Sequence, residues 1–128
     1  MADKFKFEII TPENTIYNKD SEEVTIPSYE GLMTILKDHI PLVTFLRPGI
    51  ITVKNDETRQ FYTEEGTVEF SNNKMLILTS RTYDTQTLEK SKINEMIEEA
   101  TKDFNKKDID DKMRFFLSHK IDTLKEIT

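Results

Sequence analysis

The sequence has no cysteine and no tryptophan, and its 128 residues include only three glycines, four prolines and two histidines. Without cysteine it forms neither a disulfide nor a thiolate metal site, so a reducing cytoplasm is the expected compartment. Gly31, Gly49 and Gly66 cannot supply the spacing of the G-x-x-x-x-G-K-[ST] or G-x-G-x-x-G phosphate-binding loops. The lack of tryptophan also counts against a sugar-binding platform, which usually relies on aromatic faces.

Long hydrophobic runs are lacking too. The longest are short stretches such as Met75 to Leu78, far below the roughly 20 apolar residues of a transmembrane helix. Met1 to Glu8 alternates Phe with Lys and acids and does not have the apolar core of a signal peptide. The formal charge of -6, without a basic run interleaved with aromatics, disfavours nucleic acid as a partner. Membrane contact is therefore expected only through another protein.

The first two thirds of the chain carry the alternating pattern of β-strands. Phe5, Phe7 and Ile9 would face one side of a sheet while the polar residues between them face the other. Further short apolar runs predict strands at Val24 to Ile26, Leu42 to Leu46, Ile50 to Val53, Gln60 to Thr63, Thr67 to Phe70 and Met75 to Thr79. Turn residues are expected at 11–14, 18–20, 47–49, 55–56, 65–66 and 71–73.

After Tyr83 the period changes to that of amphipathic helices. A first helix is predicted over about Thr87 to Asn105, from the stripe Ile93, Met96, Ile97, Ala100 and Phe104. Its candidate N-caps are Asp84, Thr85 and Thr87. A second helix follows the stripe Ile109, Met113, Phe116, Leu117, Ile121, Leu124 and Ile127.

Asp108 is the candidate N-cap of the second helix, with Asp110 and Asp111 complementing its positive end. The short break at 105–107 would fold the two helices antiparallel. The sequence thus predicts an α+β protein with two domains. An N-terminal antiparallel β-sandwich would span 1–84, and a C-terminal antiparallel two-helix hairpin would span 85–128. Each helix has one apolar face, so the hairpin could pack on itself, on the sandwich or on a partner.

The residues that could carry catalysis form no clear constellation. Asp108 and Asp110 open like a calcium loop, but Met113 stands at the required glycine position, so helix capping explains them better. His39 is the most distinctive polar residue and is more often structural than a general base in such a context. Glu30 or Asp38 could pair with it only through folding. No metal ligand set is predicted.

The segment from Ile26 to Gly49 reads IPSYEGLMTILKDHIPLVTFLRPG and resembles the signature of the ATP synthase epsilon subunit family. Its elements are a proline-ended strand, a glycine turn, an apolar pair, a His-x-Pro step and a later Pro-Gly turn. A second block, Phe61 to Leu78, is similar to that family's pattern of glycine, valine and glutamate followed by an Asn-Lys turn and an apolar strand. With a β half followed by a helical hairpin, the resemblance covers nearly the whole chain.

The resemblance implies a non-catalytic subunit in the central stalk of a proton-translocating F-type ATP synthase, peripheral at the cytoplasmic face of the bacterial inner membrane. Its partners would be the gamma subunit and the ring of c subunits. Carried over to this sequence, Glu30, Gly31 and Leu32 would contact the c ring. The segment facing gamma would contain three further residues, namely His39, Pro41 and Leu42.

In this family the hairpin can extend toward the alpha and beta subunits and block ATP hydrolysis with basic side chains. The candidates here are Lys112, Arg114, Lys120 and Lys125. The alternative is that they are ordinary solvated cations of a helix surface. ATP-binding members carry an Ile/Leu-Asp-x-x-Arg-Ala motif, whereas this chain has Leu88-Glu89-Lys90-Ser91-Lys92-Ile93. Lysine lacks the planar fork of arginine, so these differences count against ATP binding, and no cofactor is predicted.

Two other classes of function stay open at this stage. A stand-alone sandwich would bind a small ligand without a protein partner. A small enzyme would use His39 with Glu30 or Asp38, and its turnover would be lost in His39→Ala.

Overall fold

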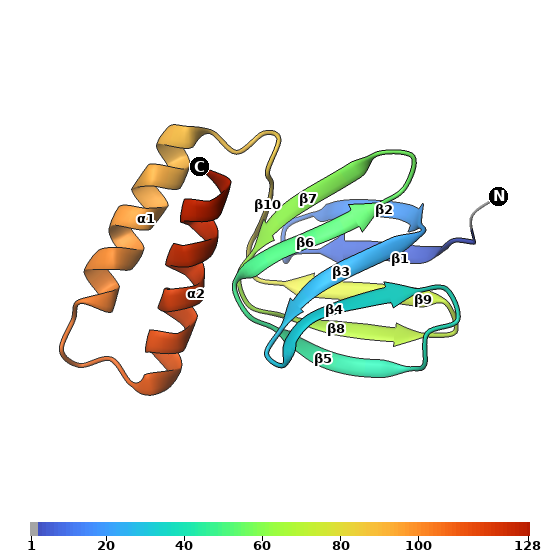
Figure 1. The fold of residues 1–128 in the computed structure, drawn as a ribbon, viewed down its shortest axis with the longest axis horizontal. Coiled ribbons are helices and arrows are strands. Elements are labelled where there is room, and N and C mark those ends of the chain that lie inside the picture. The colour runs from blue at the N-terminus through green and yellow to red at the C-terminus, as the bar shows by residue number, and fades with distance from the viewer. Residues whose placement is uncertain (1–2) are drawn as a thin grey trace.

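The computed structural model describes residues 3–128 and contains a β-sandwich followed by two helices (Figure 1). The α+β class predicted from the sequence is therefore confirmed. The strands are β1 (Phe5–Ile10), β2 (Thr15–Ser21), β3 (Glu23–Ser28), β4 (Gly31–Leu36), β5 (Leu42–Leu46), β6 (Gly49–Lys54), β7 (Thr58–Thr63), β8 (Gly66–Ser71), β9 (Lys74–Thr79) and β10 (Thr82–Asp84). The helices are α1 (Lys90–Phe104) and α2 (Asp111–Ile127).

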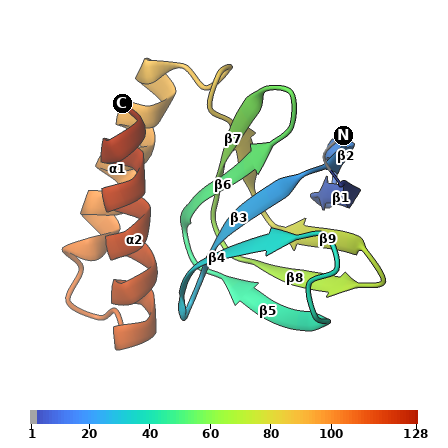
Figure 2. The same cartoon turned by 45° about the vertical axis from the view of Figure 1, so that its right-hand side comes forward.

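Hydrogen bonds join the strands in the order β10-β7-β6-β3-β5-β8-β9-β1-β2, with β4 added at β3. The path bends between β3 and β5, which share a single paired position, Ser28 with Leu46. This bend turns one continuous sheet into the two facing layers visible in Figure 2. Among the described strands the pairings are antiparallel except that of β1 with β9, which is parallel with Phe7 opposite Met75.

The core lies between the two layers and is built from the side chains at alternate positions along the strands, which point inward. Phe5, Phe7 and Ile9 are all buried, as the alternation predicted. Aromatic pairs cross the interior, with Phe5 and Phe70 ring centroids 5.5 Å apart. Tyr17 and Phe61 lie 5.4 Å apart and join the far edge of the sheet at β2 back to β7. The sandwich is thus nearly closed into a barrel.

The helical hairpin packs against the outside of the sandwich, beside β6, β7 and β10 (Figure 2). A second cluster of buried side chains fills this junction, formed by Tyr62, Ile93, Met96 and Leu124. Ile50 and Tyr83 from the sandwich pack against it. Of the three arrangements left open by the apolar stripes, the hairpin therefore adopts the one docked on the sandwich, with α1 and α2 also in contact.

The turn predicted at Asn18 to Asp20 is wrong, because these residues lie inside β2. Asn18 pairs with Glu8 and Asp20 pairs with Lys6 of β1. Both residues have low strand propensity, but they are exposed on an edge strand where backbone pairing outweighs that preference. Three of the observed strands, β2, β4 and β10, were not among the runs predicted as strands.

The predicted helix starts need correction as well. The helix α1 begins at Lys90, and its N-cap Glu89 makes no side-chain capping bond. The expected caps instead form a turn after β10, in which the amide of Leu88 donates to the carbonyl of Asp84 at 3.1 Å. For α2 the N-cap is Asp110 rather than Asp108, and its carboxylate accepts from the amide of Met113 at 2.8 Å.

Candidate functional site

Exposed hydrophobic side chains concentrate in one segment of the sandwich. Nine large hydrophobic residues of the described chain are exposed, and six of them fall between positions 29 and 45. These six are Tyr29, Leu32, Leu36, Ile40, Val43 and Phe45. Scattered apolar surface is ordinary, but this concentration of exposed apolar side chains makes the stretch a candidate surface for contact with another molecule. The same stretch carries the family resemblance.

The turn between β3 and β4 holds the predicted ring-contact residues at one end of the sandwich (Figure 1). Glu30 is exposed, and Leu32 is 72% exposed, the apolar side chain pointing to solvent. Gly31 has φ +122°, a backbone conformation that L side chains rarely adopt. The hydroxyl of Ser28 donates to the carbonyl of Gly31 at 2.6 Å and closes the turn. The turn is therefore a defined protrusion with an apolar tip.

The predicted gamma-facing residues lie in the connection between β4 and β5 and at the start of β5. The Nδ1 atom of His39 lies 2.7 Å from the carbonyl oxygen of Ile40, so Nδ1 carries the hydrogen. Its ring packs edge-on against Phe70 at 5.8 Å. Pro41 is exposed, whereas Leu42 is half-buried and packs against the sandwich core. Ile40, which the sequence did not single out, is 74% exposed between them.

The two predicted contact groups are not brought together, because they lie at opposite ends of β4 (Figure 1). Glu30 is thereby separated from His39 by the length of the strand. Asp38 is engaged elsewhere, since its carboxylate accepts from the side-chain amide of Asn73 at 2.9 Å. The carboxylate and histidine arrangement required by the small-enzyme alternative is not formed by these residues.

A polar contact also joins the hairpin to the sandwich. The ammonium of Lys120 on α2 lies 3.1 Å from the Glu64 carboxylate, which directly follows β7. The Tyr62 hydroxyl donates to the same carboxylate oxygen at 3.0 Å. Burial raises the pKa of Tyr62 above its ordinary value, and the negative charge of Glu64 raises it further, so this phenol remains a neutral donor.

The four predicted inhibitory cations occupy different environments. Lys112, Arg114 and Lys125 are exposed, whereas the Lys120 side chain is only 14% exposed. Arg114 lies over the ring of Phe104, 5.8 Å from its centroid, and so links the two helices. The sequence could not distinguish Lys120 from the others, although the consecutive aromatics Phe61 and Tyr62 were a signal that β7 is covered on both faces.

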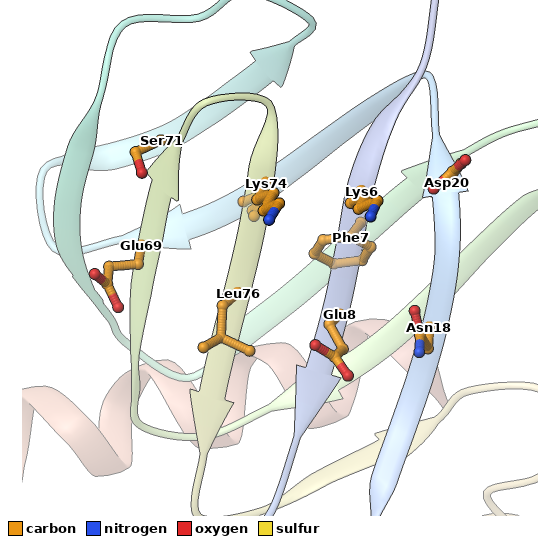
Figure 3. Close-up of a pocket in the computed structure, with 10 residues that line it drawn as sticks. Lys6, Phe7, Glu8, Asn18, Asp20, Glu69, Ser71, Lys74 and Leu76 are labelled. Atoms are coloured by element: carbon orange, nitrogen blue, oxygen red, sulfur yellow. The ribbon is translucent and has the colours of Figure 1, made fainter.

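The sandwich surface also has a shallow depression over β8, β9, β1 and β2 (Figure 3). Lys6 and Lys74 lie side by side at one end of it, where the register pairs them. The carboxylates of Glu8 and Glu69 also line it. Charges of both signs thus alternate over a polar surface. Within residues 3–128 no group of His, Asp and Glu side chains is arranged to hold a metal ion.

Comparison with known proteins decides the family. The family model described as "ATP synthase, Delta/Epsilon chain, beta-sandwich domain" matches residues 4–84. The ATP synthase epsilon chain of Pelagibacter ubique is 41% identical over 130 residues, covering 99% of each chain. The chain belongs to the ATP synthase epsilon chain family. It is therefore a non-catalytic subunit, as the sequence resemblance implied, and the two alternative classes are set aside.

Two solved structures share the fold of this epsilon family member. A chain of the Euglena gracilis mitochondrial ATP synthase, from a structure of OSCP, F1 and c-ring in rotational state 1, superimposes with a TM-score of 0.77 at 19% identity. The match covers 96% of this chain and 80% of that one. A chain of the Tetrahymena thermophila mitochondrial ATP synthase central stalk and c-ring gives a TM-score of 0.66 at 16% identity, covering 98% and 96%. Neither helix in residues 3–128 is long and apolar enough to cross a membrane.

Proposed function

We propose that this epsilon chain works in the central stalk of an F-type ATP synthase, where its sandwich links the gamma subunit to the ring of c subunits. Proton-driven rotation of the ring would then be transmitted to the catalytic head. The observation that carries this proposal is the concentration of exposed hydrophobic side chains between Tyr29 and Phe45. A subunit that transmits torque needs broad, rigid contacts, and a nearly closed sandwich provides a stiff support for them.

The gamma contact is assigned to His39, Pro41 and Leu42, together with the exposed Ile40 between them. The amide of His39 donates to the carbonyl of Leu36 at 3.1 Å, and the amide of Asp38 donates to the Asn73 side chain at 2.7 Å. The loop is thus held in place before any partner binds. Such preorganisation lowers the entropy cost of forming an interface.

The contact with the c ring is assigned to Glu30, Gly31 and Leu32. Its position at the opposite end of β4 from the gamma contact allows the sandwich to bind two partners at the same time. An exposed leucine beside a carboxylate suits a partner surface with both apolar and polar groups. Contact with the membrane would run through this complex, at the cytoplasmic face of the bacterial inner membrane.

The hairpin is assigned a regulatory role. Residues 1–84 would form the rotor domain and residues 85–128 a separate unit that leaves the sandwich and reaches the alpha and beta subunits. Extended, it would bring Lys112, Arg114, Lys120 and Lys125 near acidic surfaces of the head and inhibit ATP hydrolysis. The junction is mostly an apolar cluster built around Tyr62, so docking and release would differ by a free energy that partners can shift.

The partner assignments are tested by calorimetric titration of the full chain into purified gamma and, separately, into the c ring. Ile40→Ser should weaken binding to gamma at least about tenfold and leave ring binding unchanged, because it removes a central apolar contact. Leu32→Ser should have the reverse specificity. Met113→Ser is the matched control, since Met113 on α2 is an exposed apolar residue, at 45%, that lies outside both surfaces. Equal effects of all three variants on both partners would refute the assignment.

A further inference from the structure

We propose that Lys120, Glu64 and Tyr62 form a charge-paired latch that fixes the docked position of the hairpin and hides one of its cations. Among the ion pairs of residues 3–128, the pair of Lys120 with Glu64 is the one that joins the hairpin to the sandwich. The two side chains are 14% and 8% exposed, so both charges lie in the covered junction. The proposal rests on the proposed function only where it concerns hydrolysis.

The latch is specific because its three groups come from rigid elements. Tyr62 lies in β7 beside Phe61, with Phe61 facing the sandwich core and Tyr62 facing the hairpin. Glu64 follows two residues later, and its carboxylate accepts a hydrogen bond from the Tyr62 hydroxyl. This bond keeps the carboxylate directed at α2. Lys120 reaches it from the middle of α2, about one helical turn before the apolar contact at Leu124. A helix shifted by one turn would leave both charges covered and unpaired.

The energetics favour a role in selecting the docked position over a role in adding stability. A buried ion pair gains little over an apolar pair of the same size, because both charges lose their hydration. Removing one partner is costly, because the other charge then stays covered without compensation. Either single neutral variant should therefore drive the hairpin off the sandwich, while neutralising both partners should let it dock again.

Docking also has a consequence for the charge that the hairpin presents. Lys112, Arg114 and Lys125 are exposed in the docked hairpin, but Lys120 is neutralised and covered by Glu64. Release of the hairpin would expose the Lys120 ammonium together with the apolar face of the hairpin. Glu64 thus competes with any acidic partner surface for the same lysine, which makes the sandwich a competitor of the head.

The docked population of the full chain can be measured by pulsed electron paramagnetic resonance. Because the chain lacks cysteine, spin labels attach only at introduced positions, and Thr58→Cys on β7 with Ser118→Cys on α2 uses two exposed, uncharged sites. Glu64→Gln and Lys120→Gln should each raise the undocked fraction at least about tenfold. The double variant should return toward the parent. Lys125→Gln removes a positive charge from an exposed site of the same helix and should change nothing.

A Lys120→Gln variant that stays docked would overturn the latch, and so would a double variant that is more undocked than either single one. Circular dichroism separates undocking from unfolding, and Lys120→Arg, which keeps the charge, should remain docked if the glutamine variant fails to fold. Hydrolysis by the assembled enzyme is measured separately with Glu64→Gln. Undocking without any change in hydrolysis would leave the latch in place and contradict only the inhibitory role.

Discussion

Tyr29 and Phe115 stack face to face, with ring centroids 5.4 Å apart and planes inclined by 16°. Tyr29 belongs to the turn between β3 and β4, next to the residues assigned to the c ring, and Phe115 belongs to α2. Phe115 also packs against the ring of His119 in an edge-to-face arrangement, with ring centroids 4.4 Å apart. The proposed contact with the c ring and the docked hairpin are thus physically joined. A change in the turn between β3 and β4 can therefore reach the hairpin through the stacked side chains of Tyr29 and Phe115, and a change in the hairpin can reach the turn.

Replacing Phe115 with alanine should loosen the turn that carries Glu30 and Gly31. Stacked aromatic pairs contribute about 1 kcal/mol beyond their area, so faster amide hydrogen exchange in the turn is expected, without global unfolding. Met113→Ala on the same helix removes an exposed side chain that makes no such stack and should leave the exchange unchanged. Equal protection in both variants would mean that the stack does not restrain the turn.

Leu124 is fully buried at the junction and should be essential for docking. Truncation of a buried leucine to alanine costs about 2–5 kcal/mol, through lost transfer energy and the cavity left behind. Chemical denaturation should show this loss in the transition that reports on the helices. Leu78→Ala, at a site that is 45% exposed on β9, should change stability by less than about 0.5 kcal/mol. Similar losses in the two variants would contradict the buried role of Leu124.

The two aspartates before α2 should differ in their contribution to the helix. Asp110→Ala removes the carboxylate that accepts from the Met113 amide and should destabilise the helix by about 1 kcal/mol. Asp108→Ala removes a similar charge without a capping bond, and should have a much smaller effect. Thermal unfolding followed by circular dichroism compares them. A larger loss in the Asp108 variant would restore the cap expected from the sequence.

The sequence was most informative where one side of an element is buried. The alternation of Phe5, Phe7 and Ile9 and the helical spacing of Ile93 and Met96 both record the face turned to a core, and the structure buries all five. The spacing of apolar residues indicates the secondary structure, because packing against a core requires apolar side chains along the buried face of each strand or helix. The family resemblance was equally direct, because it depends on ordered local motifs.

Features that depend on tertiary contacts could not be predicted. Asn18 and Asp20 form strand only because β1 pairs with them, which outweighs their local turn preference. The Glu64 and Lys120 pair joins positions far apart in the chain, and nothing in a helix surface marks one lysine among several. The partner of an ionic group is set by the docking geometry, which is defined only once both elements are placed.

The docked hairpin should become less stable as the solution is acidified. Burial lowers the pKa of His119 below its ordinary value of 6.5, Arg47 of the sandwich lowers it further, and Asp122 opposes the shift. The unfolded or undocked chain therefore binds a proton more readily, so the stability gained from neutral His119 is fully present above pH 6.5 and is lost as the pH falls through the folded pKa. The docked population, measured by spin-label distances from pH 7.5 downward, should decline over that pH window. His119→Gln should flatten this decline. His39→Gln, on the opposite side of the sandwich, should retain it. An unchanged decline in His119→Gln would assign the effect to carboxylates instead.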